Sequence, residues 1–525
     1  MPLPLLARTQ DADARFIRTP ARRSLGVGGP RVRTLGPSVS ERMPGRVPGA
    51  GEQYRFHFDM GRCIGCKSCV VACNEQNGNP AAINWRRVDE IEGGWYPNTS
   101  RAFLSMGCNH CVDPTCLSGC PVDAYAKDAA TGIVRHSADT CIGCQYCTWN
   151  CSYGVPQYNP ERGVVGKCDM CHGRLEHGQA PACVSACPEG AIAIEIVRTA
   201  EWREAVAAAS SGHGLPLSDG SLSTTRVTLP VKLPPSARPV HLTNVRPAEP
   251  HWPLVVMTVL TQLSVGAFAA IWLQQLFGGS AHLGAAALTS FLVAGLALNA
   301  STLHLGRPIH AYRALKMWKR SWLSREVLLF TAFSGVAASY AAALWFALPG
   351  GVVLGGLTSM LGVAGVTASA CIYRVVSRPA WNTRYTLFQF NLTAAALGPL
   401  LAAAVSATSG ERSARWLALA AAAMAGAQLA LIALRFFRLV AAGSIELQGS
   451  ARLLSTTLRS RFLARGALLA VGGIVLPLLA QGAFLLWVAL VVALAGEVLG
   501  RYLFFVSVVP KHMAAPYLEL GSEAA

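Results

Sequence analysis

Charged residues are scarce in this chain, and acidic residues nearly vanish from its second half. Only 14% of the 525 residues are Asp, Glu, Lys or Arg, whereas soluble domains average about 25%. From residue 253 onward there is no Asp, and there are six Glu against nineteen Lys and Arg. Long apolar runs replace the missing charges, so most of the net charge of +17 belongs to a predicted membrane domain. This placement argues against nucleic-acid binding as the origin of the basic balance.

The first fifty residues lack an apolar run of any length. They contain nine Arg together with many Pro and Gly. An export signal needs a hydrophobic stretch after its basic residues, so the Arg22–Arg23 pair does not predict twin-arginine export. We expect residues 1–52 to form a disordered basic leader.

Cysteine is nearly absent outside one short region. Sixteen of the seventeen cysteines lie between residues 63 and 187, and Cys371 alone lies in an apolar run, where we interpret it as a small buried hydrophobe. The first and third groups have the spacing C-x2-C-x2-C-x3-C, and the second and fourth lengthen one gap and end in Cys-Pro. The four groups are Cys63, Cys66, Cys69, Cys73; Cys108, Cys111, Cys116, Cys120; Cys141, Cys144, Cys147, Cys151; and Cys168, Cys171, Cys183, Cys187.

This spacing is typical of iron–sulfur ligands. A cubane cluster needs four thiolates around one centre, three from a tight loop and one from elsewhere in the chain. Sixteen thiolates therefore predict four 4Fe–4S clusters. Zinc sites use paired C-x2-C units without the third cysteine or the C-x3-C-P that follow here. Disulfides would need an oxidising compartment, for which no export signal is present.

The cysteine groups predict an α+β ferredoxin-like polycluster domain. Short strand-like pieces at 132–134 and 191–196 should form small antiparallel hairpins beside the cluster loops. A stretch rich in Ser, Pro and Thr follows and predicts an extended linker. The expected organisation is a leader at 1–52, the cluster domain at 53–198, the linker at 199–252, an all-α integral membrane bundle at 253–515 and a tail at 516–525.

Eight apolar runs are each near the roughly 20 residues that cross a bilayer. Loops after the second, fourth and sixth runs are rich in Arg and Lys, whereas the opposite loops carry only Arg412 and Arg415. The positive-inside rule then places both termini and the cluster domain in the cytoplasm of a bacterial inner membrane. The runs lie at 254–277, 283–303, 326–347, 350–373, 386–408, 416–439, 466–482 and 484–509, the last boundary being the least distinct.

The cysteine domain resembles the iron–sulfur subunit of dimethyl sulfoxide reductase-type molybdoenzymes. The motifs that carry this resemblance are C-I-G-C at 63–66, C-N-H-C at 108–111 and K-C-D-M-C at 167–171. The membrane half resembles that enzyme's anchor subunit through H-W-P-L at 251–254, H-L-G-R-P at 304–308, S-W-L-S-R-E at 321–326 and R-P-A-W-N at 378–382. The similarity spans about 53–515 and implies a fusion of the two subunits.

The resemblance implies that cluster ligands cross between the groups. Some relatives have Trp where Cys144 stands and hold a 3Fe–4S cluster there, so Cys144 implies four complete cubanes. The implied ligand sets are Cys63, Cys66, Cys69 with Cys187; Cys168, Cys171, Cys183 with Cys73; Cys108, Cys111, Cys116 with Cys151; and Cys141, Cys144, Cys147 with Cys120.

By this resemblance the chain is not an enzyme on its own. It would relay electrons between a quinone, either menaquinone or ubiquinone, and a separate molybdopterin catalytic subunit, as in anaerobic respiration. One alternative is a cytoplasm-facing sulfite dehydrogenase subunit, which the loop charges favour. A pump or anchor whose clusters only stabilise the fold is disfavoured, because four clusters in series exceed what stability needs.

The resemblance also implies a quinol site at His304 and Glu326. Both lie at the basic end of a predicted span, where a hydroxyl could meet an acceptor while the tail stays in lipid. Histidine suits this role because its ordinary pKa is near neutrality. The alternative is that each residue only marks the water interface. For Glu497, with Arg501 one turn on, a proton path and a structural ion pair both stay open.

No haem is expected, because no histidine pair lies in mid-span. His304 and His310 are close together at one interface, and His282 is near the other.

Overall fold

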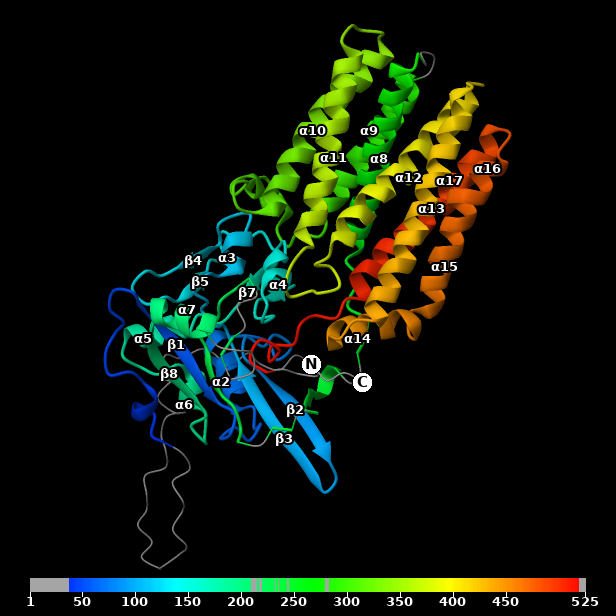
Figure 1. The fold of residues 1–525 in the computed structure, drawn as a ribbon. Coiled ribbons are helices and arrows are strands. Elements are labelled where there is room, and N and C mark those ends of the chain that lie inside the picture. Colours follow the sequence, from blue (N-terminus) through cyan, green and yellow to red (C-terminus); the bar gives the residue numbers. More distant parts are fainter. Residues whose placement is uncertain are drawn as a thin grey trace, which may run out of the picture. The chain divides into compact units, whose positions relative to one another are not determined.

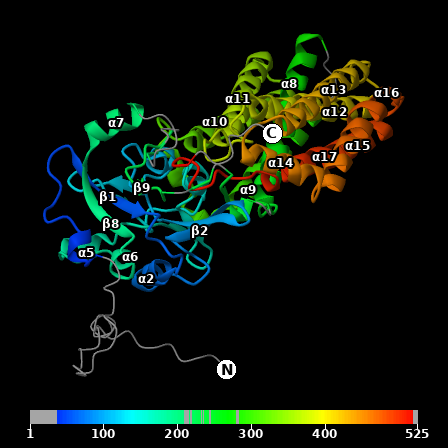
Figure 2. The ribbon, with the colours of Figure 1, turned by 60° about the horizontal axis from the view of Figure 1, so that its bottom comes forward.

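The computed structural model describes residues 37–208, 215–216, 220–231, 233–234, 236–242, 245–278 and 283–518. These residues form a small sheet-and-helix domain and then a helical bundle, shown in Figures 1 and 2. This is the predicted order of an α+β cluster domain and an all-α membrane bundle. Residues 1–36 of the expected leader, His282 and residues 519–525 lie outside the described residues.

The cluster domain is framed by short strands in four small sheets. β1 is the central strand of one sheet, antiparallel to β8 and parallel to β9, and β2–β3 is a hairpin that β10 extends. β4 pairs with β5, and β6 pairs with β7. The strands are β1 (Glu52–Asp59), β2 (Arg87–Trp95), β3 (Asn98–Met106), β4 (Tyr125–Lys127), β5 (Val134–His136), β6 (Gln157–Asn159), β7 (Val164–Gly166), β8 (Ile192–Arg198), β9 (Arg226–Thr228) and β10 (Arg238–Pro239).

Short helices connect these strands, and several of them begin inside a cysteine group. They are η1 (Ser40–Arg42), α2 (Ser68–Asn77), α3 (Thr115–Gly119), α4 (Tyr146–Asn150), α5 (His172–Glu176), α6 (Ala182–Ser185), α7 (Thr199–Ala208) and η2 (Val240–Leu242).

The hairpin prediction is right for β4–β5 but wrong for β8. Instead of a local partner, β8 pairs with β1 from the other end of the domain, with Ile192 opposite Phe58 and Ile194 opposite Phe56. All four of these side chains are buried. The alternating pattern of this segment predicts a strand, but it does not specify the partner.

The described parts of the segment expected to be a linker belong to the cluster domain. Strand β9 extends the sheet of β1, strand β10 extends the sheet of β2, and the buried Trp202 of α7 donates from Nε1 to Ser223 O at 2.7 Å. The last part of the expected leader is also ordered, since the buried Arg42 donates to Val184 O at 2.6 Å. The ordered cluster domain therefore extends beyond both predicted boundaries.

Eight helical segments of the described chain are long and apolar enough to cross a membrane, as predicted. The seventh contains a π-helical stretch, and Ala480 to Gly482 separate it from the eighth. An amphipathic helix, α14 (Ile445–Ser455), follows the sixth span and was not predicted. The spans are α8 (Trp252–Leu276), α9 (Leu283–Thr302), α10 (Trp322–Trp345), α11 (Gly351–Ile372), α12 (Arg384–Thr408), α13 (Ser413–Val440), α15–η4–α16 (Arg459–Ala470, Val471–Val475, Leu476–Leu479) and α17 (Ala483–Val506); η3 (Pro308–Leu315) joins α9 to α10.

After α17 the chain returns to the cluster domain. Tyr517 is fully buried there, and its hydroxyl shares a hydrogen bond of 2.5 Å with Ser223 Oγ. His512 Nε2 lies 2.8 Å from Asp89 Oδ2 on β2. The first residues of the predicted tail are therefore packed, and they tie the end of the bundle to the cluster domain.

Candidate iron–sulfur relay and quinone site

The structure brings cysteines of different groups close together, and the four ligand sets that the resemblance implies stay a prediction. Two of the sets each line a small cavity, with thiols from two different groups around it, which is the arrangement a cubane needs. The first set is Cys63, Cys66, Cys69 and Cys187, the second is Cys73, Cys168, Cys171 and Cys183, the third is Cys108, Cys111, Cys116 and Cys151, and the fourth is Cys120, Cys141, Cys144 and Cys147.

Residues with positive φ shape the loops of the first and third groups. Gly65 and Lys67 have φ of 71° and 60°, and Gly143 and Gln145 have φ of 70° and 59°. A left-handed residue near each of two cysteines turns the loop around one centre before α2 or α4 begins. The repeated spacing C-x2-C-x2-C therefore gives the same local backbone at both places.

Two buried cations lie between neighbouring sets. Arg86, 2% exposed, lies beside Cys69 and Cys183 of the first two sets, and its Nη1 donates to Ser105 Oγ at 3.1 Å. Burial alone would lower the pKa of Arg86, but the neighbouring thiolates raise it above its ordinary value. No sequence motif marks Arg86, because its role depends on contacts between distant segments.

Lys167 is the second buried cation, and it lies between the second and third sets. It is 3% exposed, lies beside Cys168 and Cys108, and donates from Nζ to Cys168 O at 2.9 Å. Burial lowers the pKa of Lys167, and the surrounding thiolates more than offset that effect. The two cations thus place the sets in the order first, second, third; Tyr125, beside Cys116 and Cys147, joins the third to the fourth.

The loop of the fourth set docks on the membrane domain by direct backbone contact. A Cβ at Gly306, between α9 and η3, would lie 2.1 Å from Gly163 O, so only glycine fits there. The neighbouring Arg307 donates its backbone N–H to Ile142 O at 3.1 Å, within the loop that carries Cys144. The membrane domain therefore holds this cluster loop at a fixed position.

The start of α10 holds the fourth set from another side. Ser321 Oγ donates to Gly119 O at 2.7 Å, and Ser324 Oγ donates to Pro121 O at 3.4 Å. These two carbonyls flank Cys120, the cysteine of the second group that is predicted to belong to this set. Both serines are fully buried, so the contact excludes water.

Glu326 lies in the first turns of α10 and is 6% exposed. The pKa of Tyr146 is raised by burial and, to a smaller extent, by the charges of Cys144, Cys371 and Glu326, so its phenol lies in the neighbourhood of this carboxylate. Tyr146 is the first residue of α4 and stands between Cys144 and Cys147 in the sequence. A phenol therefore lies beside both the carboxylate and the fourth set, a contact that the sequence motifs did not predict.

His304 follows the end of α9, and its Nδ1–H donates to Ser301 O, which leaves Nε2 as an acceptor. Burial lowers the pKa of His304 to about 4, so the ring is neutral at pH 7. This pKa lies below the ordinary histidine value near neutrality, because the ring is partly buried, which the sequence does not reveal.

Three packed rings, those of His251, Trp149 and Tyr373, lead from the neighbourhood of His304 to that of Glu326. His251, which lies near His304, packs on Trp149 of α4 with ring centroids 5.2 Å apart. Trp149 in turn lies 5.8 Å from Tyr373, which is near Glu326. Both candidate quinone residues therefore approach α4, the helix of the fourth set.

Glu497 does not pair with Arg501 as one predicted alternative had it. Glu497 accepts a hydrogen bond from Thr393 Oγ1 at 3.0 Å, and the nearest cationic nitrogen among the described ion pairs is Arg465 Nη2, at 4.0 Å. Arg501 instead donates to Gln262 Oε1 at 2.8 Å. Both residues are buried in α17.

Comparison with known proteins identifies both halves of the chain. Residues 99–196 match the 4Fe-4S dicluster domain family, and residues 247–506 match the DMSO reductase anchor subunit (DmsC) family. One chain of the anaerobic dimethyl sulfoxide reductase of Haemophilus influenzae is 42% identical over 146 residues, which are 26% of this chain and 71% of that protein. The protein belongs to the family of that dimethyl sulfoxide reductase chain.

Other relatives agree with this assignment. The equally named chain of the Escherichia coli dimethyl sulfoxide reductase is 42% identical over 144 residues, 26% of this chain and 70% of that protein. A subunit of the sulfite dehydrogenase of Allochromatium vinosum is 34% identical over 160 residues, 26% of this chain and 67% of that protein. The predicted fusion is confirmed: this family member carries the anchor domain on the same chain and is a multi-pass membrane protein with iron–sulfur sites.

Proposed function

We propose that this protein relays electrons between the quinone pool and a separate molybdopterin catalytic subunit. The observation that carries the proposal is the position of the fourth cysteine set, which is held on the membrane domain beside Tyr146 and Glu326. Bound 4Fe–4S clusters, one in each set, would supply one-electron redox centres at four successive positions. The residues between the sets, Arg86 and Lys167, support this by placing positive charge beside the thiolates.

The first set is the proposed contact with the catalytic subunit. Cys66 is exposed, and the neighbouring Ile64 and Val71 are 58% and 62% exposed. Apolar side chains at a surface beside a redox site are suited to a protein–protein contact. Electrons would thus enter or leave the chain at this end and exchange with quinone at the other.

Glu326 and His304 are the proposed quinone residues. Oxidation of a quinol releases two protons with its two electrons, so the site needs acceptors for hydroxyl protons near the first electron acceptor. The Glu326 carboxylate and the free Nε2 of His304 are such acceptors, and both lie near α4. The low pKa of His304 suits a hydrogen-bond acceptor that positions a hydroxyl better than a group that stores the proton.

A comparison of two assays tests this assignment. We expect Glu326→Gln and His304→Gln to abolish quinone-coupled turnover of the full complex, whereas turnover of the catalytic subunit with a soluble dye survives. Glu411→Gln, a carboxylate change between the fifth and sixth spans, serves as the matched control and should leave both activities unchanged. Full quinone-coupled activity in both site variants would mean that Glu326 and His304 only mark the membrane–water interface and do not bind quinone.

A sulfite:quinone dehydrogenase subunit is the second candidate. The basic η3 loop lies against the cluster domain, where Arg313 donates to Asp139 O at 3.1 Å and Arg320 pairs with Asp123. By the positive-inside rule, a cluster domain on the basic side faces the cytoplasm of a bacterial inner membrane. A reporter active only in the periplasm should then be silent after Ala525 and active in the 409–413 loop; the reverse pattern would remove the support for this candidate.

A further inference from the structure

Buried charge is unbalanced in the second half of the membrane bundle. Arg465, Arg501 and Glu497 are each at most 5% exposed, and Arg435 is partly buried beside them. Three cations thus face one carboxylate in this part of the bundle. An uncompensated charge inside a membrane protein is costly, and such residues mark functional sites by default.

Two of the three arginines have contacts that stabilise part of their charge. The Arg501 guanidinium lies 3.6 Å from the centre of the Phe390 ring and hydrogen-bonds Gln262. Arg435 donates to Gln389 Oε1 at 2.7 Å and to Ala380 O at 3.0 Å. These contacts spread the positive charge but do not neutralise it, and Nε and Nη1 of Arg501 have no hydrogen-bond partner among the described residues.

Arg465 combines unpaired donors with a position in the lining of a pocket. Its Nε and Nη2 have no hydrogen-bond partner in the described part of the chain, although only 5% of the residue is exposed. The nearest carboxylate oxygen, on Glu497, is 4.0 Å from Nη2, beyond hydrogen-bond distance. A buried guanidinium with free donors needs an acceptor that the described protein atoms do not provide.

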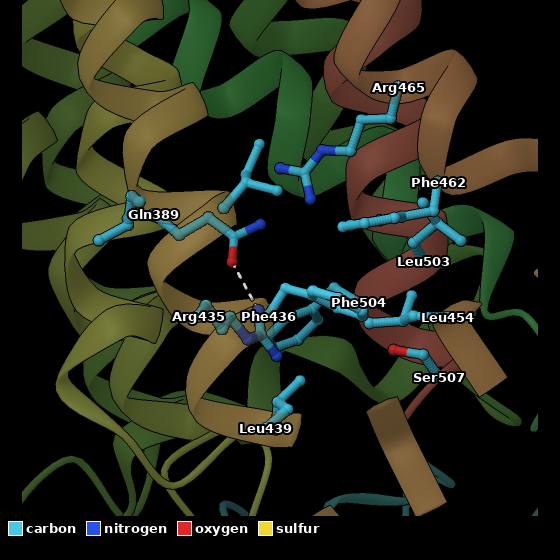
Figure 3. Close-up of a pocket in the computed structure, with 12 residues that line it drawn as sticks. Gln389, Arg435, Phe436, Leu439, Leu454, Phe462, Arg465, Leu503, Phe504 and Ser507 are labelled. Carbon is cyan, nitrogen blue, oxygen red and sulfur yellow. Dashed lines mark hydrogen bonds between the residues drawn. The ribbon is translucent and has the colours of Figure 1, made fainter. Parts of the chain in front are cut away.

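The Arg465 guanidinium points into a pocket between α13, α15 and α17, drawn in Figure 3. Arg435 lines the opposite part of this pocket, and Phe436, Phe462 and Phe504 form apolar walls. None of the described residues that line it is acidic. The pocket therefore combines two cationic groups with walls suited to hydrocarbon.

The depth of the pocket matches the boundary between headgroups and hydrocarbon. Arg435 lies five residues before the end of α13 at Val440, and Arg465 lies six residues after the start of α15, so each is about 8 Å from its helix end. The 28 residues of α13 span about 42 Å, close to the full bilayer with its headgroups. The exposed Arg459 and Arg461 add positive charge at the same end of α15.

We propose that this pocket binds the phosphate of an acidic phospholipid. The free donors of Arg465 and the charge of Arg435 would hold the phosphate oxygens, since the guanidinium fork matches phosphate geometry. The acyl chains would run along Phe436 and Phe462. Basic pockets between membrane helices on this side of a bilayer are suited to anionic lipid headgroups.

Native mass spectrometry of the full chain, purified in mild detergent with its clusters, tests the proposal. We expect acidic phospholipid to remain bound to the wild type and to be lost from Arg465→Gln, with binding weakened about tenfold, the loss of one charge-assisted contact. Arg459→Gln removes the same charge from an exposed site on the same helix and should retain the lipid. Arg465→Lys keeps the positive charge and should retain part of the bound lipid. Lipid retention in this variant would show that a substitution at position 465 permits folding.

A second arm distinguishes the ligand. In nanodiscs, replacing phosphatidylcholine in part with phosphatidylglycerol should raise the thermal unfolding midpoint of the wild type but not of Arg465→Gln, and inorganic phosphate added to pure phosphatidylcholine discs should have no effect. Equal lipid retention in Arg465→Gln and Arg459→Gln would overturn the proposal. So would stabilisation by free phosphate alone, or quinone in place of phospholipid in the retained fraction.

Discussion

The two ends of the cysteine relay are built for different kinds of contact. The fourth set is enclosed by the membrane domain, with Gly306 against Gly163 and buried serines on α10 donating to the carbonyls around Cys120. At the first set, Cys66 and Ile64 are exposed. A permanent contact within one chain permits close backbone packing without water, whereas a contact with a separate subunit must leave accessible apolar surface. On the proposed function, the fusion of the two subunits would fix one end of the relay and leave the other for a partner.

The largest effect is expected from Gly306→Val, which disrupts the backbone contact between Gly306 and Gly163 at the fixed end of the relay. The added Cβ would lie 2.1 Å from Gly163 O, so the fourth cluster loop must shift. Because misplacement by about 1 Å can cost about 100-fold in rate, quinone-coupled turnover should fall by that order, while iron content and dye-coupled turnover stay normal. Gly335→Val is the matched control, since a Cβ there meets nothing within 4 Å. An equal loss in both variants would mean that the close contact at Gly306 does not position the loop.

A smaller effect is expected when single ligands are exchanged at the two ends. Cys144→Ala should convert one cluster to a 3Fe form, leave the others intact and slow the reduction of all remaining clusters by quinol. Cys66→Ala should alter one cluster without slowing the reduction of the other three. Electron paramagnetic resonance after mixing with a quinol measures both. If Cys66→Ala were the slower variant, the order of the relay would be reversed.

The exposed end should respond to surface changes that leave the fixed end untouched. Ile64→Ser removes an apolar side chain from the proposed contact and should weaken binding of the catalytic subunit by about tenfold. Reduction of the clusters by quinol should be unchanged. Val231→Ser, at a side chain that is 100% exposed elsewhere, is the control for binding assays. Unchanged affinity in the Ile64 variant would move the partner contact away from the first set.

The smallest effect is expected from a substitution at Lys167, which lies between the two ends of the relay. Lys167→Met removes the buried cation between the second and third sets, so the reduced, more negative state loses a favourable interaction. The midpoint potential of a neighbouring cluster should fall by about 60 mV, the one-electron equivalent of a tenfold change. Arg162→Met removes an exposed charge and should leave the potentials unchanged in a redox titration. A shift of equal size in both would show that Lys167 acts only through overall charge.

The sequence predicts those features that a single chemical requirement imposes locally. Four thiolates around a cubane require the cysteine spacing, and a bilayer requires eight apolar runs, so the sets and spans follow from the motifs. The partner of β8, the burial of Arg86 and the position of Tyr146 beside Glu326 depend on contacts between distant segments. The lowered pKa of His304 could not be predicted for the same reason, because burial comes from tertiary packing.

The central claim is that quinone exchanges electrons with the cysteine relay at the membrane end. The most direct test is to add a quinol anaerobically to the purified full chain in lipid vesicles and to record the cluster spectra before and after. The claim predicts spectra of reduced clusters in the wild type, from about sixteen iron per chain on the four-cubane pattern, and their absence in Glu326→Gln, although dithionite reduces both proteins. Clusters that stay oxidised with quinol in the wild type, yet are reduced by dithionite, would contradict it.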